Sequence, residues 1–175
     1  MSTSLSELAL LRLVAQRIAG PRAASPAEAV GRLLAVQGQD YPGALTSVAL
    51  RTAGAKRGDV EAALDAGDVV RSWPMRSTLH LVPAAELGWL MALCGPRVLT
   101  GAAKRRAQLG LDTDDAERAR TLATEALAGG GRLARSALLQ RLSDGGIDTS
   151  GQRGYHLLWY AAQTGTVVLG PTDGR

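Results

Sequence analysis

The sequence predicts a mainly α-helical protein with small β-hairpins, built from tandem winged helix-turn-helix units that are joined by a helical segment. Three observations lead to this prediction. Leucine, alanine and valine dominate the apolar residues and phenylalanine is absent, a composition that suits packed helices better than sheets. The helical patterns of the first third give way, over residues 68–83, to a segment rich in valine, threonine and tryptophan. Helices followed by a hairpin occur in this order in a winged helix, and a similar order begins again after residue 131.

Start signals mark the first two helices. Ser4-Leu5-Ser6-Glu7 has the pattern of a capping box, and apolar residues recur at helical spacing behind it until Gly20-Pro21 ends the helix. Ser25-Pro26 repeats the start signal, with proline at the first helical position. We expect this second helix to continue through Val36 and to carry Gln37 in its last turn.

Two further helices and a hairpin complete the first unit. Pro42-Gly43 starts a segment with helical character, and Asp59 is expected to cap a short helix. Two strands are predicted at residues 69–73 and 77–82, and the connection around Pro74-Met75 forms the tip of the hairpin.

A long helical region opens at Pro83 and is expected to be kinked or broken at Gly95-Pro96. The helix that follows it begins with aspartates, which suit the positive end of the helix dipole. The three glycines at 129–131 are interpreted as a hinge or linker.

The remaining chain predicts a second unit of helix, helix and strand. Ser136 is expected to cap the first helix, the second runs from near Thr149 or Ser150 to Gly165, and residues 166–171 have the composition of a strand. We therefore expect a first winged-helix unit with a Gln-Gly-Gln motif, a helical connector, and a second winged-helix unit with a truncated wing, at residues 1–82, 83–131 and 132–175.

Composition and charge limit the class of protein. The 175 residues suffice to bury a core, and a net charge of +4 with a pI near 9.8 allows a nucleic-acid partner. The single cysteine, Cys94, excludes a disulfide within the chain and fits a reducing compartment. The N-terminus has no signal-peptide pattern and no stretch has the length of a membrane span. We expect a cytoplasmic protein without a membrane partner.

Metal and cofactor chemistry has no sequence support. His80 and His156, with one cysteine, offer no ligand spacing for a metal, and no phosphate-binding glycine loop or nucleophile elbow is present. We therefore expect no metal and no organic cofactor.

Polar and aromatic side chains gather around the predicted hairpin. The candidate DNA contacts are Arg71, Trp73, Arg76 and His80, since the wing of a winged helix meets a phosphate backbone. The planar guanidinium of arginine suits this role because it can donate two hydrogen bonds to one phosphate. The alternative is that one arginine ties the hairpin to its own helices, that the tryptophan packs beneath it, and that the histidine is structural.

The segment "LLAVQGQD", residues 33–40, places two glutamines and an aspartate where the second helix is expected to end. One interpretation is a polar helix end. The other is a set of groups that hold a water molecule or a base, because each side-chain amide offers an acceptor oxygen and two donors.

Three segments together resemble a known family. "LLAVQGQD", "VVRSWPMRSTLHLVPAAEL" and "GQRGYHLLWYAAQTGTVVLGP" are similar to the AlkZ/YcaQ family of bacterial winged-helix DNA glycosylases. The resemblance spans nearly the whole chain. Family members carry three winged-helix units, so we expect the third to be absent here.

The resemblance implies a function and a site. The family's catalytic motif is Gln–apolar–Gln or Gln–apolar–Asp, and Gln37 and Gln39 match its ends while Gly38 departs from the apolar middle residue. The implied reaction is hydrolysis of the N-glycosidic bond of a cationic N7-alkylpurine, or of a crosslinked one, by a water that the glutamines position. The implied partner is double-stranded DNA, with further phosphate contacts expected from Arg135, Arg153 and His156 in the second unit.

Two other classes of function stay open at this point. The chain could be a winged-helix DNA-binding protein or regulator without catalysis, which the glycine inside the motif would favour. It could also be a winged-helix domain that binds protein.

Overall fold

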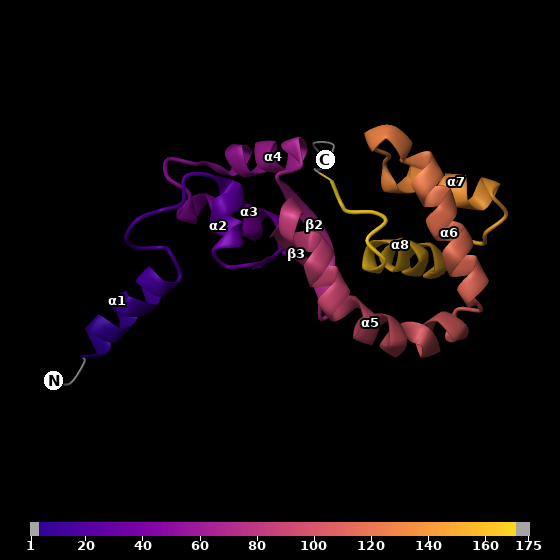
Figure 1. The fold of residues 1–175 in the computed structure, drawn as a ribbon, viewed down its shortest axis with the longest axis horizontal. Helices are drawn as coiled ribbons and strands as arrows, with labels where there is room; N and C mark the ends of the chain where they lie inside the picture. Colours follow the sequence, from indigo (N-terminus) through magenta and orange to yellow (C-terminus); the bar gives the residue numbers. More distant parts are fainter. Residues whose placement is uncertain (1–3, 171–175) are drawn as a thin grey trace. The chain divides into compact units, whose positions relative to one another are not determined.

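The computed structural model describes residues 4–170 (Figure 1). These residues form eight α-helices and a three-stranded sheet. The helices are α1 Leu5–Ala15, α2 Pro26–Gly31, α3 Tyr41–Arg51, α4 Arg57–Ala66, α5 Ala84–Gln108, α6 Thr113–Ala126, α7 Arg135–Asp144 and α8 Arg153–Gln163. The strands are β1 Val36–Gln37, β2 Val69–Met75 and β3 Thr78–Pro83, and a 3₁₀ turn covers Ala128–Gly130. The predicted mainly helical class with a small hairpin is confirmed.

The sheet has the strand order β1-β3-β2, so the hairpin strand β3 lies in its centre. β1 pairs with β3 in antiparallel fashion, with Val36 opposite Leu81 and Gln37 opposite His80. The predicted hairpin is therefore present, but it has a third strand that the sequence interpretation assigned to a helix.

The tip of the hairpin lies two residues later than predicted. Arg76 and Ser77 both have φ of 54°, the left-handed conformation that a two-residue hairpin turn requires. The predicted tip at Pro74 is wrong, because Pro74 lies inside β2. β2 is an edge strand of this sheet, the position in which proline is tolerated.

The chain divides into two compact units. The first comprises the residues before Ser72 together with Leu79–Leu87, and the second comprises Ser72–Thr78 and Gly88–Leu169. The predicted boundaries at 82 and 131 stay a prediction.

The core of the first unit lies between the sheet and helices α2, α3 and α4. Its fully buried members include Val30, Val48, Val60, Val69 and Leu81. Helix α1 contributes nothing to it, since none of the residues of α1 is buried.

Local capping explains where several helices begin. The predicted capping box of α1 is present, with the Glu7 N–H donating to Ser4 and the Ser4 N–H donating to Glu7. Two predicted caps are wrong. The carboxylate of Asp59 lies at the third position of α4 and accepts from the Lys56 N–H, while α7 begins at Arg135 with Ala134 as its N-cap, so Ser136 lies inside the helix.

Helix α5 runs continuously through Pro96, so the helix is not broken there, and the kink expected as the alternative stays a prediction. Thr100 donates its hydroxyl to the Pro96 carbonyl at 2.9 Å. The backbone of Gln163 lies close to Gly95 and explains the glycine there. A Cβ at this position would lie 3.3 Å from the Gln163 carbonyl oxygen.

Helices α6, α7 and α8 pack together in the second unit, with Leu138, Leu142 and Leu157 buried between them (Figure 1). In the described part of the predicted strand after α8, residues 166–170, Leu169 forms a single β-bridge and no strand is present.

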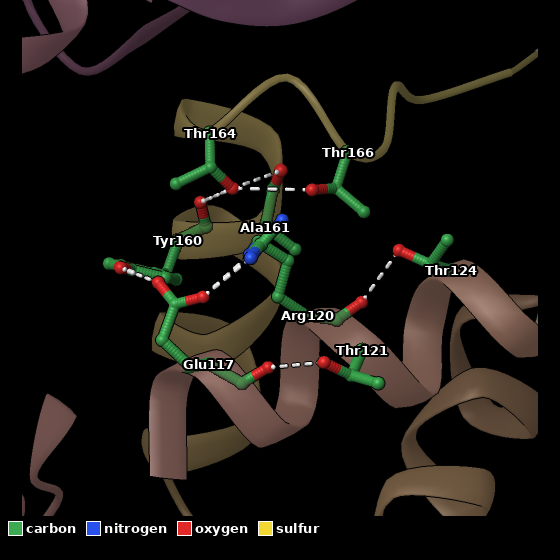
Figure 2. Close-up of polar contacts among 8 residues, drawn as sticks. All are labelled: Glu117, Arg120, Thr121, Thr124, Tyr160, Ala161, Thr164 and Thr166. Carbon is green, nitrogen blue, oxygen red and sulfur yellow. Dashed lines mark hydrogen bonds and ion pairs between the residues drawn. The ribbon is translucent and has the colours of Figure 1, made fainter. Parts of the chain in front are cut away.

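A polar network joins α6 to α8 (Figure 2). The Tyr160 hydroxyl donates to Glu117 at 2.5 Å, and the other carboxylate oxygen of Glu117 accepts from Arg120 at 2.8 Å. Hydrogen bonds from Tyr160 and then Arg120 lower the pKa of the Glu117 carboxyl below its usual 4.5.

This network predicts an acid-dependent contribution to stability. Because the pKa of Glu117 is lowered in the folded state, its contribution is present above about 4.5 and is lost as the pH falls through the folded value. Tyr160→Phe is expected to lower the free energy of unfolding at pH 7 by about 1 kcal/mol. It should also reduce the loss of stability that accompanies the fall in pH. Urea denaturation at pH 7 and pH 4 measures both. Tyr155→Phe is the matched control, since Tyr155 is an exposed tyrosine of the same helix and should leave the pH dependence unchanged.

Candidate functional site

The two glutamines of the motif lie in a segment, residues 36–39, that begins as strand β1 and alternates between buried and exposed residues. Val36 and Gly38 are buried whereas Gln37 and Gln39 are exposed, the alternation expected of a strand with one solvated face. The Gly38 N–H continues the pairing by donating to the Leu79 carbonyl at 2.7 Å. Both amide side chains are thus presented to solvent from a paired backbone.

The prediction that Gln37 lies in the last turn of a helix is wrong. Helix α2 ends at Gly31, and Leu34 adopts a left-handed φ of 66° that turns the chain into β1. Pairing with β3 buries Val36 against the core, and this tertiary contact outweighs the helical pattern of the sequence.

The side-chain amides of the two glutamines face each other. Gln37 Nε2 donates to Gln39 Oε1 over 3.4 Å, a long and therefore weak hydrogen bond. Together they retain several donors and an acceptor for a third group. Neither amide titrates near neutral pH, so the pair can orient a water molecule without acting as a strong base.

Arg71 holds the backbone between the glutamines. Its Nε and one terminal nitrogen donate to the Gly38 carbonyl oxygen at 3.0 and 2.8 Å. Its guanidinium also lies over the ring of Tyr41, 5.1 Å from the centroid. Burial lowers the pKa of the Arg71 guanidinium, with Tyr41 acting in the opposite direction. The alternative in which an arginine ties the hairpin to its own unit thus describes this side chain.

Asp40, the carboxylate next to the motif, is the N-cap of α3. Its Oδ1 accepts from the Gly43 N–H at 3.1 Å. A Cβ at Gly43 would lie 2.3 Å from the Asp40 carboxylate, so a larger residue there would displace the capping side chain. The sequence signal for this cap was present, since proline follows Asp40 at a first-turn position. The carboxylate therefore has a structural role beside the glutamines.

The hairpin residues predicted to contact DNA differ in exposure. Arg76 is exposed in the turn, whereas Trp73 and His80 are buried. The Trp73 ring packs edge-on against Tyr155 at 6.3 Å, and its carbonyl accepts from Gln163 at 2.6 Å. Contact of Trp73 or His80 with DNA would require these side chains to leave the interior.

The predicted contacts in the second unit are likewise divided. Arg135 is exposed and lies over the ring of Tyr155 at 5.5 Å. Arg153 donates to the Leu109 carbonyl at 2.7 Å and pairs with Asp148 at 2.9 Å. His156 is buried, and burial, with Arg106 and Arg105, lowers its pKa, which favours the neutral ring. Of the three, Arg135 is the side chain most open to a phosphate, and all three contacts stay predictions.

Gly38, the departure from the expected motif, has room for a side chain. A Cβ there would lie 3.5 Å from the backbone of His80, an ordinary contact, and its φ is outside the left-handed region. Gly38→Ala is therefore expected to raise the free energy of unfolding by about 0.4–1 kcal/mol through the unfolded chain. Thermal denaturation measures this. Gly67→Ala is the matched opposite case, because Gly67 has a φ of 80°. This replacement should lower the free energy of unfolding by about 1 kcal/mol.

Within residues 4–170 no cluster of three or more histidine, cysteine, aspartate or glutamate side chains could hold a metal ion. Over the same residues, the helices are too short or too polar to cross a membrane.

Comparison with known proteins places this chain in a family. The family described as "DNA glycosylase AlkZ-like" matches residues 30–175, which include both glutamines and the hairpin. No curated protein matches the chain. Among solved structures, Streptomyces sahachiroi DNA glycosylase AlkZ superposes with a TM-score of 0.78 at 26% sequence identity, covering 100% of this chain and 48% of that one. The chain thus spans about half the length of that enzyme. The resemblance noted in the sequence is confirmed, and the protein belongs to the AlkZ-like DNA glycosylase family.

Proposed function

We propose that this chain is a DNA glycosylase that hydrolyses the N-glycosidic bond of cationic N7-alkylpurines in double-stranded DNA. The observation that carries the proposal is the exposed pair of amides, Gln37 and Gln39, in a segment whose backbone is held on both sides. Family membership and the similarity to a DNA glycosylase support it.

The chemistry suits two amides. A purine alkylated at N7 is positively charged and leaves readily, so the sugar develops oxocarbenium character with little acid assistance. The oxygen of a held water bonds to C1′, the electrons of the C1′–N9 bond leave with the neutral base, and the surplus proton passes to solvent. The glutamines supply orientation and polar stabilisation. An unmodified guanine is a poor leaving group and should resist such weak catalysis.

DNA binding is proposed to use the two winged-helix units, acting in the bacterial cytoplasm. The exposed arginines Arg76 and Arg135 are available for phosphates, which would fix the register on the duplex without reading sequence. The damaged base must be extruded or otherwise reached before the water can attack.

The test is base release by the full 175-residue chain. A duplex containing 7-methylguanine is incubated with the protein, and free base and abasic sites are measured by chromatography and by alkaline strand cleavage. We expect release well above the spontaneous rate, none from unmodified duplex, no effect of EDTA, and no strand break before alkali. Binding of duplex DNA without any base release would overturn the proposal.

That outcome would support the second candidate, a non-catalytic winged-helix DNA-binding protein. The observation that favours it is Gly38, which replaces the apolar middle residue of the expected motif. Salt-dependent binding to duplex DNA is common to both candidates, so base release decides between them.

A further inference from the structure

Both peptide groups of Gly38 are held. The N–H, in the peptide that joins it to Gln37, donates to Leu79 at 2.7 Å. The carbonyl, in the peptide that joins it to Gln39, accepts two hydrogen bonds from Arg71 at 3.0 and 2.8 Å. Because peptide groups are planar, fixing these two groups fixes the Cα atoms of both glutamines relative to each other.

Glycine makes this support important. A glycine has wide conformational freedom and has no side chain to pack, so hydrogen bonds to its backbone must define its conformation. The Leu79 contact belongs to the strand ladder and reaches only the first peptide. Within residues 4–170, the carbonyl of the second peptide accepts its hydrogen bonds from Arg71.

The side chain of Arg71 is itself held in place by its contacts. It lies on β2, with β3 between that strand and β1, and its half-buried guanidinium rests against Tyr41, the first residue of α3. Two of its donors already point at one carbonyl oxygen. An arginine held in this way has fewer directions left for a phosphate than an exposed one.

We propose that Arg71 is a positioning residue that holds the Gln37–Gly38–Gln39 backbone so that both amides meet one water molecule. This inference rests on the proposed function and replaces the expectation that Arg71 binds the DNA backbone. Lysine cannot substitute, because its ammonium lacks the planar fork that places two donors on one oxygen while stacking on a ring.

The first experiment measures single-turnover release of 7-methylguanine at saturating protein for Arg71→Lys and Arg71→Met. Both variants are expected to lower the rate about 10- to 100-fold, the cost of a misplaced catalytic group. The dissociation constant for duplex DNA and its salt dependence should stay unchanged. Arg51→Lys is the matched control, since Arg51 is a buried arginine of the same unit that donates to the carbonyls of Gln16 and Ser47, and it should leave the rate unchanged.

The second experiment does not depend on activity. In the ¹⁵N-labelled 18.2-kDa protein, the Gln39 amide nitrogen reports on hydrogen bonding to the Gly38 carbonyl, which shares its peptide group. Both Arg71 variants should shift this signal and increase the fast mobility of Gly38 and Gln39, while Arg51→Lys should not. Thermal denaturation identifies any variant that fails to fold. If Arg71→Met does not fold, the conservative Arg71→Lys variant is compared with the unsubstituted protein.

The outcomes separate the two proposals. A salt slope of DNA binding that falls by about one unit in Arg71→Met would make Arg71 a phosphate contact and overturn the inference. So would an unchanged release rate, or unchanged Gln39 signals, in a folded variant. If the unsubstituted protein releases no base, the glycosylase proposal fails, and altered Gln39 signals in the Arg71 variants would still support the positioning role of Arg71.

Discussion

Replacing both Gln37 and Gln39 with alanine is expected to lower the rate of 7-methylguanine release by about 100- to 1000-fold, comparable to removing a preorganised group that stabilises a transition state. The physical reason is that the two amides are exposed polar groups of the motif and, in the proposed mechanism, together orient the water. Because both side chains are exposed, the fold should be unaffected and duplex binding should change less than twofold.

The single variants add information about coupling. The amides contact each other at 3.4 Å, so each single replacement should cost nearly as much as the double one, as expected for groups that act on the same water. Gln16→Ala is the control, an exposed glutamine of the same unit outside the motif. Undiminished base release by the double variant would remove these residues from the mechanism.

The second large effect is expected from Leu81→Ala, which should lower the free energy of unfolding by about 2–5 kcal/mol. Leu81 is completely buried in the core of the first unit and lies opposite Val36, the residue before Gln37. Removing its side chain leaves a cavity behind the strand that carries the motif.

Urea denaturation followed by circular dichroism measures this loss, with an expected decrease in the midpoint of about 1–2 M for a typical dependence on urea. Leu50→Ala is the matched control, because Leu50 is 47% exposed and its replacement should change stability by less than about 0.5 kcal/mol. A Leu81→Ala variant as stable as the control would contradict the register in which Leu81 packs behind the motif.

The local sequence determined where several helices begin. The capping box at Ser4 needs only residues within one turn, and the acidic start of α6 likewise lies beside the N–H groups that it satisfies. The same local reasoning failed at Asp59 and Ser136, where a residue of capping type lies just inside the helix. Capping residues therefore indicate a helix start to within a turn.

The family could also be recognised from the sequence, because three segments along the chain have its residue types, and the role of the two glutamines stays a prediction. The orientation of the glutamines could not. Their placement in and just after a strand depends on pairing with β3, more than 40 residues later in the chain, and on the burial of Val36. A helical pattern that ends near residue 36 contains no sign of that partner.

The sequence by itself therefore determined the helical class and most helix starts, which depend on contacts within a few residues, and the family, which three segments along the chain identify. Only the tertiary structure decided that residues 36–37 form a strand, that the hairpin turns at Arg76-Ser77, and that Arg71 bonds to the Gly38 carbonyl. The physical reason is that these features are set by burial and hydrogen bonding between segments far apart in the chain, and such long-range contacts leave no periodic or capping signal in either segment.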